Sequence, residues 1–195
     1  MAARTCAYAG FVSLICSLTI ALTGCSKSRN RLEGPARPVD PCVLLTSDEI
    51  KSVQGEAVQS TKAGGNVGAE FIVSQCYFTT ATPVNSVVLT VTQNGTANGG
   101  PSLREFWKQT FGGKDDSEER HEGKVGNNEE EREGQKPERI DGVGEEAFWV
   151  GNRVGGALYV LKGNSHLRIS VGGKDDQPTK LKKSKALAEM ALKRL

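Results

Sequence analysis

A short apolar run near the start of the chain most limits what this sequence can become. Residues 8–22 contain no charged side chain, and Arg4 is the single charge among residues 1–24. A helix that crosses a bilayer needs about 20 apolar residues, so a run of about 15 is too short to span and is typical of a secretory signal peptide. The sequence therefore predicts that residues 1–24 are removed and that the mature chain folds outside the cytoplasm.

The end of this run indicates how the mature chain is held. Leu22-Thr23-Gly24-Cys25 resembles the bacterial lipobox, in which an apolar residue and two small residues precede a cysteine. The resemblance implies cleavage before Cys25, a diacylglyceryl group on its sulfur and acylation of its new amino group, which together anchor a protein stably in a membrane. An ordinary signal peptide with an incidental cysteine is the alternative. Ser26 stands where inner-membrane retention favours aspartate, so we expect the outer membrane in a host with two membranes.

Cysteine usage agrees with an oxidising compartment. Of the five cysteines, Cys6 and Cys16 lie in the predicted signal peptide and Cys25 is the predicted lipid site, which leaves Cys42 and Cys76. An even pair in such a compartment predicts a disulfide. It would close a loop of about 34 residues and contribute roughly 3–4 kcal/mol on the chain-entropy account. A pair of metal ligands or two free thiols are the alternatives.

Composition divides the mature chain into a tether and one domain. Residues 25–40 combine charges of both signs with prolines and few apolar side chains, which predicts a flexible tether. Residues 41–195 are enough for a single domain of ordinary composition. Within them, residues 114–139 are acidic and nearly free of apolar side chains, so we expect a mobile surface loop there. The formal net charge of +2 argues against a nucleic-acid partner.

The periodicity of the domain predicts an α+β fold. Two helices are expected to open with capping boxes, formed by Thr46 with Glu49 and by Ser102 with Glu105, and a third starts near Pro178. Runs of β-branched and aromatic residues predict three strands after each of the first two helices. The expected order is α-βββ-α-βββ-α, with the helices packed on one face of a largely antiparallel sheet.

No residue pattern carries a catalytic assignment. Residues 142–147 fit the dinucleotide pattern G-x-G-x-x-A, yet a polar segment precedes them and a strand follows, which predicts a glycine turn instead. His121 lies in the charged segment, while His166 follows Ser165 in a strand, where neighbouring side chains point to opposite faces. We therefore expect no catalytic residue, no metal site and no cofactor. Calcium held by the acidic segment is an alternative that lacks the usual D-x-D-x-D-G spacing.

Four stretches carry a family resemblance: "DPCVLLT" at residues 40–46 leading to Glu49, "QCYF" at 75–78, "GVGEEAFW" at 142–149 and "LYVLKG" at 158–163. Together they resemble a family of small bacterial lipoproteins with an uncharacterised extracytoplasmic domain. The resemblance covers about residues 40–195 without the acidic segment, which is longer than usual. It implies a Cys42–Cys76 disulfide and an α+β domain, and it brings no activity.

The sequence favours two kinds of function. The first is a non-catalytic, lipid-anchored envelope module that binds another envelope protein or a peptide, because the tether and the single disulfide-pinned domain accompany no convergent polar site. The second is a carrier of a small apolar, lipid-like ligand, and an enzyme is the least supported. Core packing is the default role expected of the aromatic residues that would line a carrier cavity, which are Tyr77, Phe78, Phe106, Trp107, Phe148, Trp149 and Tyr159.

Overall fold

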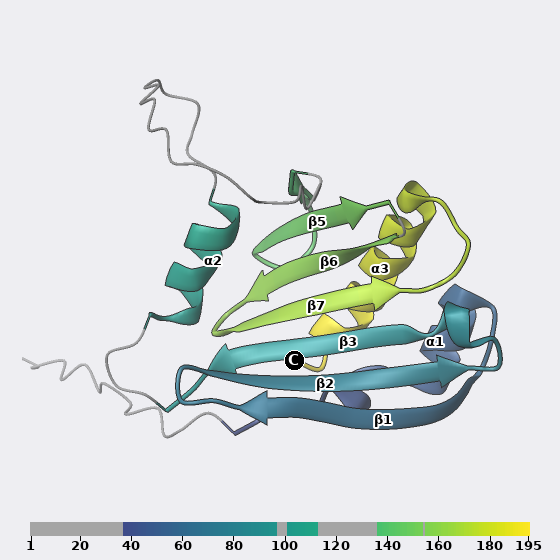
Figure 1. Cartoon of the computed structure of the whole chain (residues 1–195), viewed down its shortest axis with the longest axis horizontal. Helices are drawn as coiled ribbons and strands as arrows, with labels where there is room; N and C mark the ends of the chain where they lie inside the picture. Colours follow the sequence, from purple (N-terminus) through teal and green to yellow (C-terminus); the bar gives the residue numbers. More distant parts are fainter. Residues whose placement is uncertain (1–36, 97–100, 113–135, 154) are drawn as a thin grey trace, which may run out of the picture. The chain divides into compact units, whose positions relative to one another are not determined.

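One antiparallel sheet of seven strands organises the computed structural model of the chain, which describes residues 37–96, 101–112, 136–153 and 155–195 (Figure 1). These residues lie within one compact unit, Glu33–Leu195. The strand order across the sheet is β1-β2-β3-β7-β6-β5-β4, and every neighbouring pair is antiparallel. The strands are β1 (Val58–Val67), β2 (Phe71–Thr80), β3 (Val87–Asn94), β4 (Glu138–Arg139), β5 (Glu146–Asn152), β6 (Gly155–Lys162) and β7 (Ser165–Val171).

Helices α1 (Ser47–Gln54), α2 (Leu103–Phe111) and α3 (Gln177–Leu192) accompany the sheet, with short 3₁₀ turns η1 (Pro41–Val43) and η2 (Pro83–Asn85). The predicted mixture of helices and an antiparallel sheet is therefore confirmed.

Capping boxes open the first two helices as predicted. The Thr46 hydroxyl accepts from the Glu49 amide at 3.2 Å, and the Glu49 carboxylate accepts from the Thr46 amide at 2.8 Å. Ser102 and Glu105 repeat this arrangement at the start of α2. Helix α1 ends at Gly55, whose φ of 84° is a left-handed conformation that glycine adopts without steric cost. Residues close in the sequence thus determine the start of α1, the end of α1 and the start of α2.

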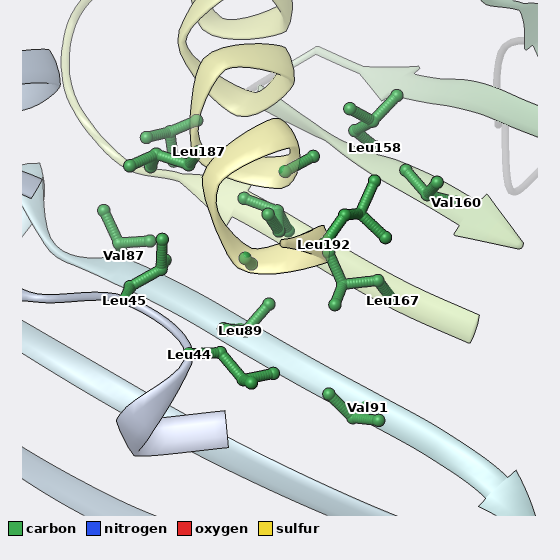
Figure 2. Packing of buried hydrophobic residues seen from close by; sticks show 14 of the residues in the cluster. Leu44, Leu45, Val87, Leu89, Val91, Leu158, Val160, Leu167, Leu187 and Leu192 are labelled. Atoms are coloured by element: carbon green, nitrogen blue, oxygen red, sulfur yellow. The ribbon is translucent and has the colours of Figure 1, made fainter. Parts of the chain in front are cut away.

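The main core lies on one face of the sheet, where α3 packs across β6 and β7 (Figure 2). Side chains alternate between faces along a strand, so Leu89, Leu158 and Leu167 all point toward α3 from three adjacent strands. Leu44, which follows η1, joins the same cluster and lies beside β3 in Figure 2. Burial of each such leucine contributes about 1.5–3 kcal/mol, and this apolar face holds the fold together.

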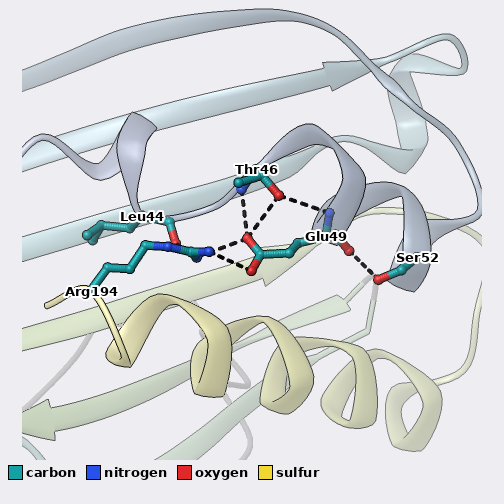
Figure 3. A network of polar contacts seen from close by, with 5 residues as sticks. All are labelled: Leu44, Thr46, Glu49, Ser52 and Arg194. Carbon is teal, nitrogen blue, oxygen red and sulfur yellow. Dashed lines mark hydrogen bonds and ion pairs between the residues drawn. The ribbon is translucent and has the colours of Figure 1, made fainter.

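A polar network ties the end of the chain to α1 on this side of the domain (Figure 3). The Arg194 guanidinium donates to both Glu49 carboxylate oxygens, at 2.9 and 3.0 Å, and to the Leu44 carbonyl at 2.9 Å. The bond from Arg194 is the largest cause that lowers the pKa of Glu49 to about 2, against the opposing effect of burial. Glu49 therefore stays ionised across the neutral range and holds two distant parts of the sequence together.

Helix α2 covers the opposite face of the sheet, so the prediction that all helices share one face is wrong. Trp107 and Phe111 pack on Phe148 of β5 and Leu161 of β6. These positions alternate with the main-core residues of the same strands, such as Trp149. Strands β5 and β6 are thus apolar on both sides, and each side needs cover to exclude water.

The predicted element order is also wrong, because the described part of the chain places four strands between α2 and α3. The added strand is β4, in which Glu138 and Arg139 pair with Trp149 and Phe148 of β5. Two exposed charged residues carry no strand pattern, so backbone pairing with β5 decides their conformation. Both residues belong to the charged segment 114–139 that is predicted to be a mobile loop, of which residues 114–135 lie outside the described structure.

Candidate functional site

The second face of the sheet is divided between an aromatic end under α2 and a polar part beyond it. Four side chains at the same level form what we call the polar row: Gln75, Thr90, Arg168 and Tyr159, which pair in register across β2, β3, β7 and β6. On the other face, the intervening positions of these strands are buried and apolar apart from the half-buried Ser74. The polar row therefore marks a surface that the fold does not need for its core.

Hydrogen bonds connect the members of the polar row. Gln75 donates to the Thr90 hydroxyl at 3.0 Å and accepts from the Tyr77 hydroxyl at 2.6 Å. At the other end, Arg168 Nε donates to the Tyr159 hydroxyl at 3.1 Å. The Arg168 guanidinium carbon also lies 5.7 Å from the centre of the Tyr159 ring, within the range of a cation–π contact. These contacts fix Arg168 in one orientation on the open face.

A pocket of about 570 Å³ adjoins the polar row, where the end of β7 leads toward α3. Tyr159 and Arg168 line one side, and Ser170 and Lys174 continue the wall. Gly172 is needed here because a Cβ at this position would lie 2.0 Å from the Val84 carbonyl oxygen. The close approach of η2 to β7 thus forms the rim of the pocket.

His166 lies under α2 at the aromatic end and not in the pocket. Its ring lies 5.9 Å from that of Trp107 and 6.3 Å from that of Phe106, measured between centres. It is 8% exposed, and burial lowers its pKa to about 4. Its Nδ1 has no hydrogen-bond partner within the described residues. His166 is therefore neutral at pH 7 and packs as part of an aromatic cluster.

Polar contacts from Arg104 near the start of α2 and from Trp107 in its middle hold the helix over this cluster. The Trp107 indole donates to the Glu146 carboxylate at 2.9 Å. Arg104 forms an ion pair of 2.6 Å with Glu145, whose other oxygen accepts from the Gly163 amide. The Gly163 bond and then Arg104 lower the pKa of Glu145. These bonds hold α2 over the aromatic end of the second face and leave the polar row uncovered by the helix.

Strand β1 gives the sheet a second accessible feature, a long free edge. It is ten residues long, pairs with β2 on one side, and has no strand on its outer side among the described residues. Nine of its ten residues are exposed. The opposite edge of the sheet is β4, which has two residues. The two edges therefore differ greatly in what they offer a partner.

The predicted disulfide is confirmed. Cys42 of η1 and Cys76 of β2 are bonded, with their Cα atoms 5.2 Å apart, and Cys76 is fully buried in the main core. Cys25, the predicted lipid site, and His121 lie outside the described residues.

The seven aromatic residues proposed as a cavity lining do not surround one cavity. Phe78 and Trp149 belong to the main core, and Tyr77 is 41% exposed on the second face. Phe106, Trp107 and Phe148 take part in the ring contacts around α2. Of the seven, Tyr159 alone lines the pocket.

Searches of protein-family models, curated proteins and solved structures find no match for this chain. The chemistry of the candidate site therefore has to be argued from its own residues. In the described segments, no helix is long and apolar enough to cross a membrane, and no group of three His, Cys, Asp or Glu side chains is placed to hold a metal ion.

The pocket residues were missed in the sequence because no motif marks them. One signal exists, since the alternation of Leu167, Ile169 and Val171 places Arg168 and Ser170 together on the opposite face. Nothing in the sequence shows that this face is open beside Arg168 and covered beside His166.

Proposed function

We propose that this protein is a non-catalytic, lipid-anchored module of the bacterial cell envelope, and that it binds an extended segment of another envelope protein along β1. The observation that carries the binding role is the long exposed edge of the sheet. The membrane address rests on the lipobox resemblance at Cys25 and on the tether.

An exposed edge strand presents unpaired N–H and C=O groups that a partner strand can bind. Proteins usually protect such edges with prolines, charged side chains, bulges or very short strands. Strand β1 has no proline; its irregular register lies at its start, between Val58 and Ser60, and Lys62 is its single charged residue. A ten-residue strand offers a partner several main-chain hydrogen bonds, so β1 suits the addition of one more strand.

The disulfide supports this role because it holds β1 in place before a partner arrives. Strand β1 and helix α1 both lie inside the loop that Cys42 and Cys76 close. A rigid edge loses less conformational entropy on binding than a strand that first has to order. The disulfide therefore favours association with a partner, although it makes no contact with that partner.

Photocrosslinking in living cells tests the β1 interface. A photoreactive residue is placed in the full chain at Lys62 or Asn66, and the crosslinked partner peptide is sequenced by mass spectrometry. Because two aligned strands advance at the same rise per residue, we expect the two positions to capture partner residues about four apart on one extended segment.

Val84 of η2 is the matched control, since it is 59% exposed and lies outside β1, in the turn that joins β2 to β3. Crosslinks that appear equally from Val84, or that scatter over the partner without a constant register, would contradict strand addition.

Removing the lipid site tests the proposed membrane localisation separately from the β1 interface. In cells that express Cys25→Ser, we expect most of the protein to leave the membrane pellet for the soluble extracytoplasmic fraction, because position 25 would no longer have the thiol that carries the diacylglyceryl group. Fractionation with immunoblotting measures this, and mass spectrometry of the mature N-terminus identifies the attached groups. An unmodified N-terminus that begins elsewhere than Cys25 in the unaltered protein would overturn the anchor.

A small-molecule carrier is the second candidate, and the pocket beside the polar row favours it. The aromatic residues of the chain mostly pack against one another and not around this pocket. Native mass spectrometry of the full chain, extracted in detergent, distinguishes a co-purifying small ligand from an unliganded protein.

A further inference from the structure

We propose that the pocket between the polar row and the start of α3 binds a small organic anion through a carboxylate or phosphate group. The inference concerns a surface separate from the β1 edge, and it stands whether or not a protein partner binds there.

Cationic groups gather around this pocket. Arg168, Lys174 and Lys180 all line it, and none of the lining residues in the described structure carries a carboxylate. Lys180 is 6% exposed, and its ammonium lies 3.7 Å from where a Cβ of Gly155 would stand. The half-buried Arg168 and the exposed Lys174 create a positive potential at the pocket that an anionic ligand would relieve.

The nearest acidic side chains are already engaged elsewhere. Asp175 follows Lys174 in sequence, but its carboxylate accepts from Lys183 at 2.6 Å. Asp176 caps α3 by accepting from the Thr179 amide at 3.0 Å, and its pKa is lowered by its bonds to Thr179. Neither carboxylate therefore forms an ion pair with Arg168 or Lys174 in the described structure.

Contacts with Tyr159 position the Arg168 guanidinium to bind an anion. Its Nε donates to the Tyr159 hydroxyl and its guanidinium carbon lies 5.7 Å from the centre of the Tyr159 ring, while its two terminal nitrogens have no partner within the described residues. A guanidinium fixed in this way binds both oxygens of a carboxylate or phosphate in the fork geometry that its donors favour. The orientation is set in advance, so little side-chain entropy is lost on binding.

The rest of the pocket indicates the size and character of the ligand. Its volume of about 570 Å³ lies within the usual range for small-molecule sites. Val84, Val150 and Ala157 add apolar surface beside the Tyr159 ring. An anion with a compact apolar body therefore fits better than a bare inorganic ion.

Calorimetric titration of the full chain in detergent tests this site with four probes: benzoate, phenyl phosphate, inorganic phosphate and the neutral benzyl alcohol. We expect benzoate or phenyl phosphate to bind at least about tenfold more tightly than both benzyl alcohol and inorganic phosphate, because only these two combine charge with an apolar body. The stronger of the two identifies carboxylate or phosphate as the preferred group.

Arg168→Gln should weaken that binding about tenfold or more, whereas Lys62→Gln on β1 removes the same charge and should change it less than about twofold. If Arg168→Gln does not fold, as judged by circular dichroism, the exposed Lys174→Gln replaces it, with an expected loss of about threefold. The proposal is overturned if no aromatic anion binds below about 10 mM, or if the pocket variants bind as tightly as the Lys62 variant.

Discussion

The double variant Cys42→Ala/Cys76→Ala is expected to lose about 3–4 kcal/mol of unfolding free energy, because the disulfide closes a loop of 34 residues in the unfolded chain. Alanine avoids placing an unpaired hydroxyl at position 76, which is fully buried. For a domain of about 150 residues, this loss corresponds to a drop of roughly 10 °C in the melting temperature.

Thermal unfolding of the full chain, followed by circular dichroism with and without reductant, measures this loss. Reductant should lower the melting temperature of the unaltered protein toward that of the variant and leave the variant itself unchanged. A difference of less than about 1 kcal/mol between the two proteins would show that the reduced chain already keeps this loop closed by packing.

Lowering the pH from 7 to 5 is expected to cost about 2 kcal/mol of stability through His166 alone. Its folded pKa of about 4 lies below the usual 6.5, so the unfolded chain binds the proton more readily. This contribution is fully present above pH 6.5 and is lost as the pH falls toward 4. Glu49, with a folded pKa of about 2, loses its own contribution below pH 4.5, outside this window.

Urea unfolding at pH 7 and at pH 5 measures the effect, and His166→Phe should flatten the difference between the two. His121 is the one other histidine of the chain, so His121→Asn is the matched control and should keep the full pH dependence. A pH dependence that survives in the His166 variant would mean that another buried group titrates in this range.

Local signals predicted the parts of the fold that depend on neighbouring residues. The capping residues Thr46 and Ser102 act within a few residues, and the structure has both as predicted. The side on which α2 packs depends on the two-sided apolar character of β5 and β6, which appears only once these strands are paired. Strand β4 likewise owes its conformation to its partner and not to its own residues.

The candidate site was less predictable for the same reason. Arg168 comes from β7 and Tyr159 from β6, and pairing in the sheet brings them together. Lys180 lies in a helix rich in basic residues, where the sequence predicts solvent exposure, yet the approach to Gly155 buries it. A pocket built from separate strands leaves no spacing in the sequence, whereas the disulfide was found from a simple count of cysteines.

The position of the disulfide also determines how the domain would respond to mechanical force. A pull on the chain ahead of residue 37 reaches the fold at η1, where Cys42 passes the load through a covalent bond to Cys76 of β2. The Val39 amide also donates a hydrogen bond of 2.8 Å to the side-chain oxygen of Gln93 in β3. Tension therefore bypasses α1 and β1, which lie between the bonded cysteines and cannot be stretched out while that bond is intact. The edge strand therefore stays under no load when the chain ahead of η1 is pulled.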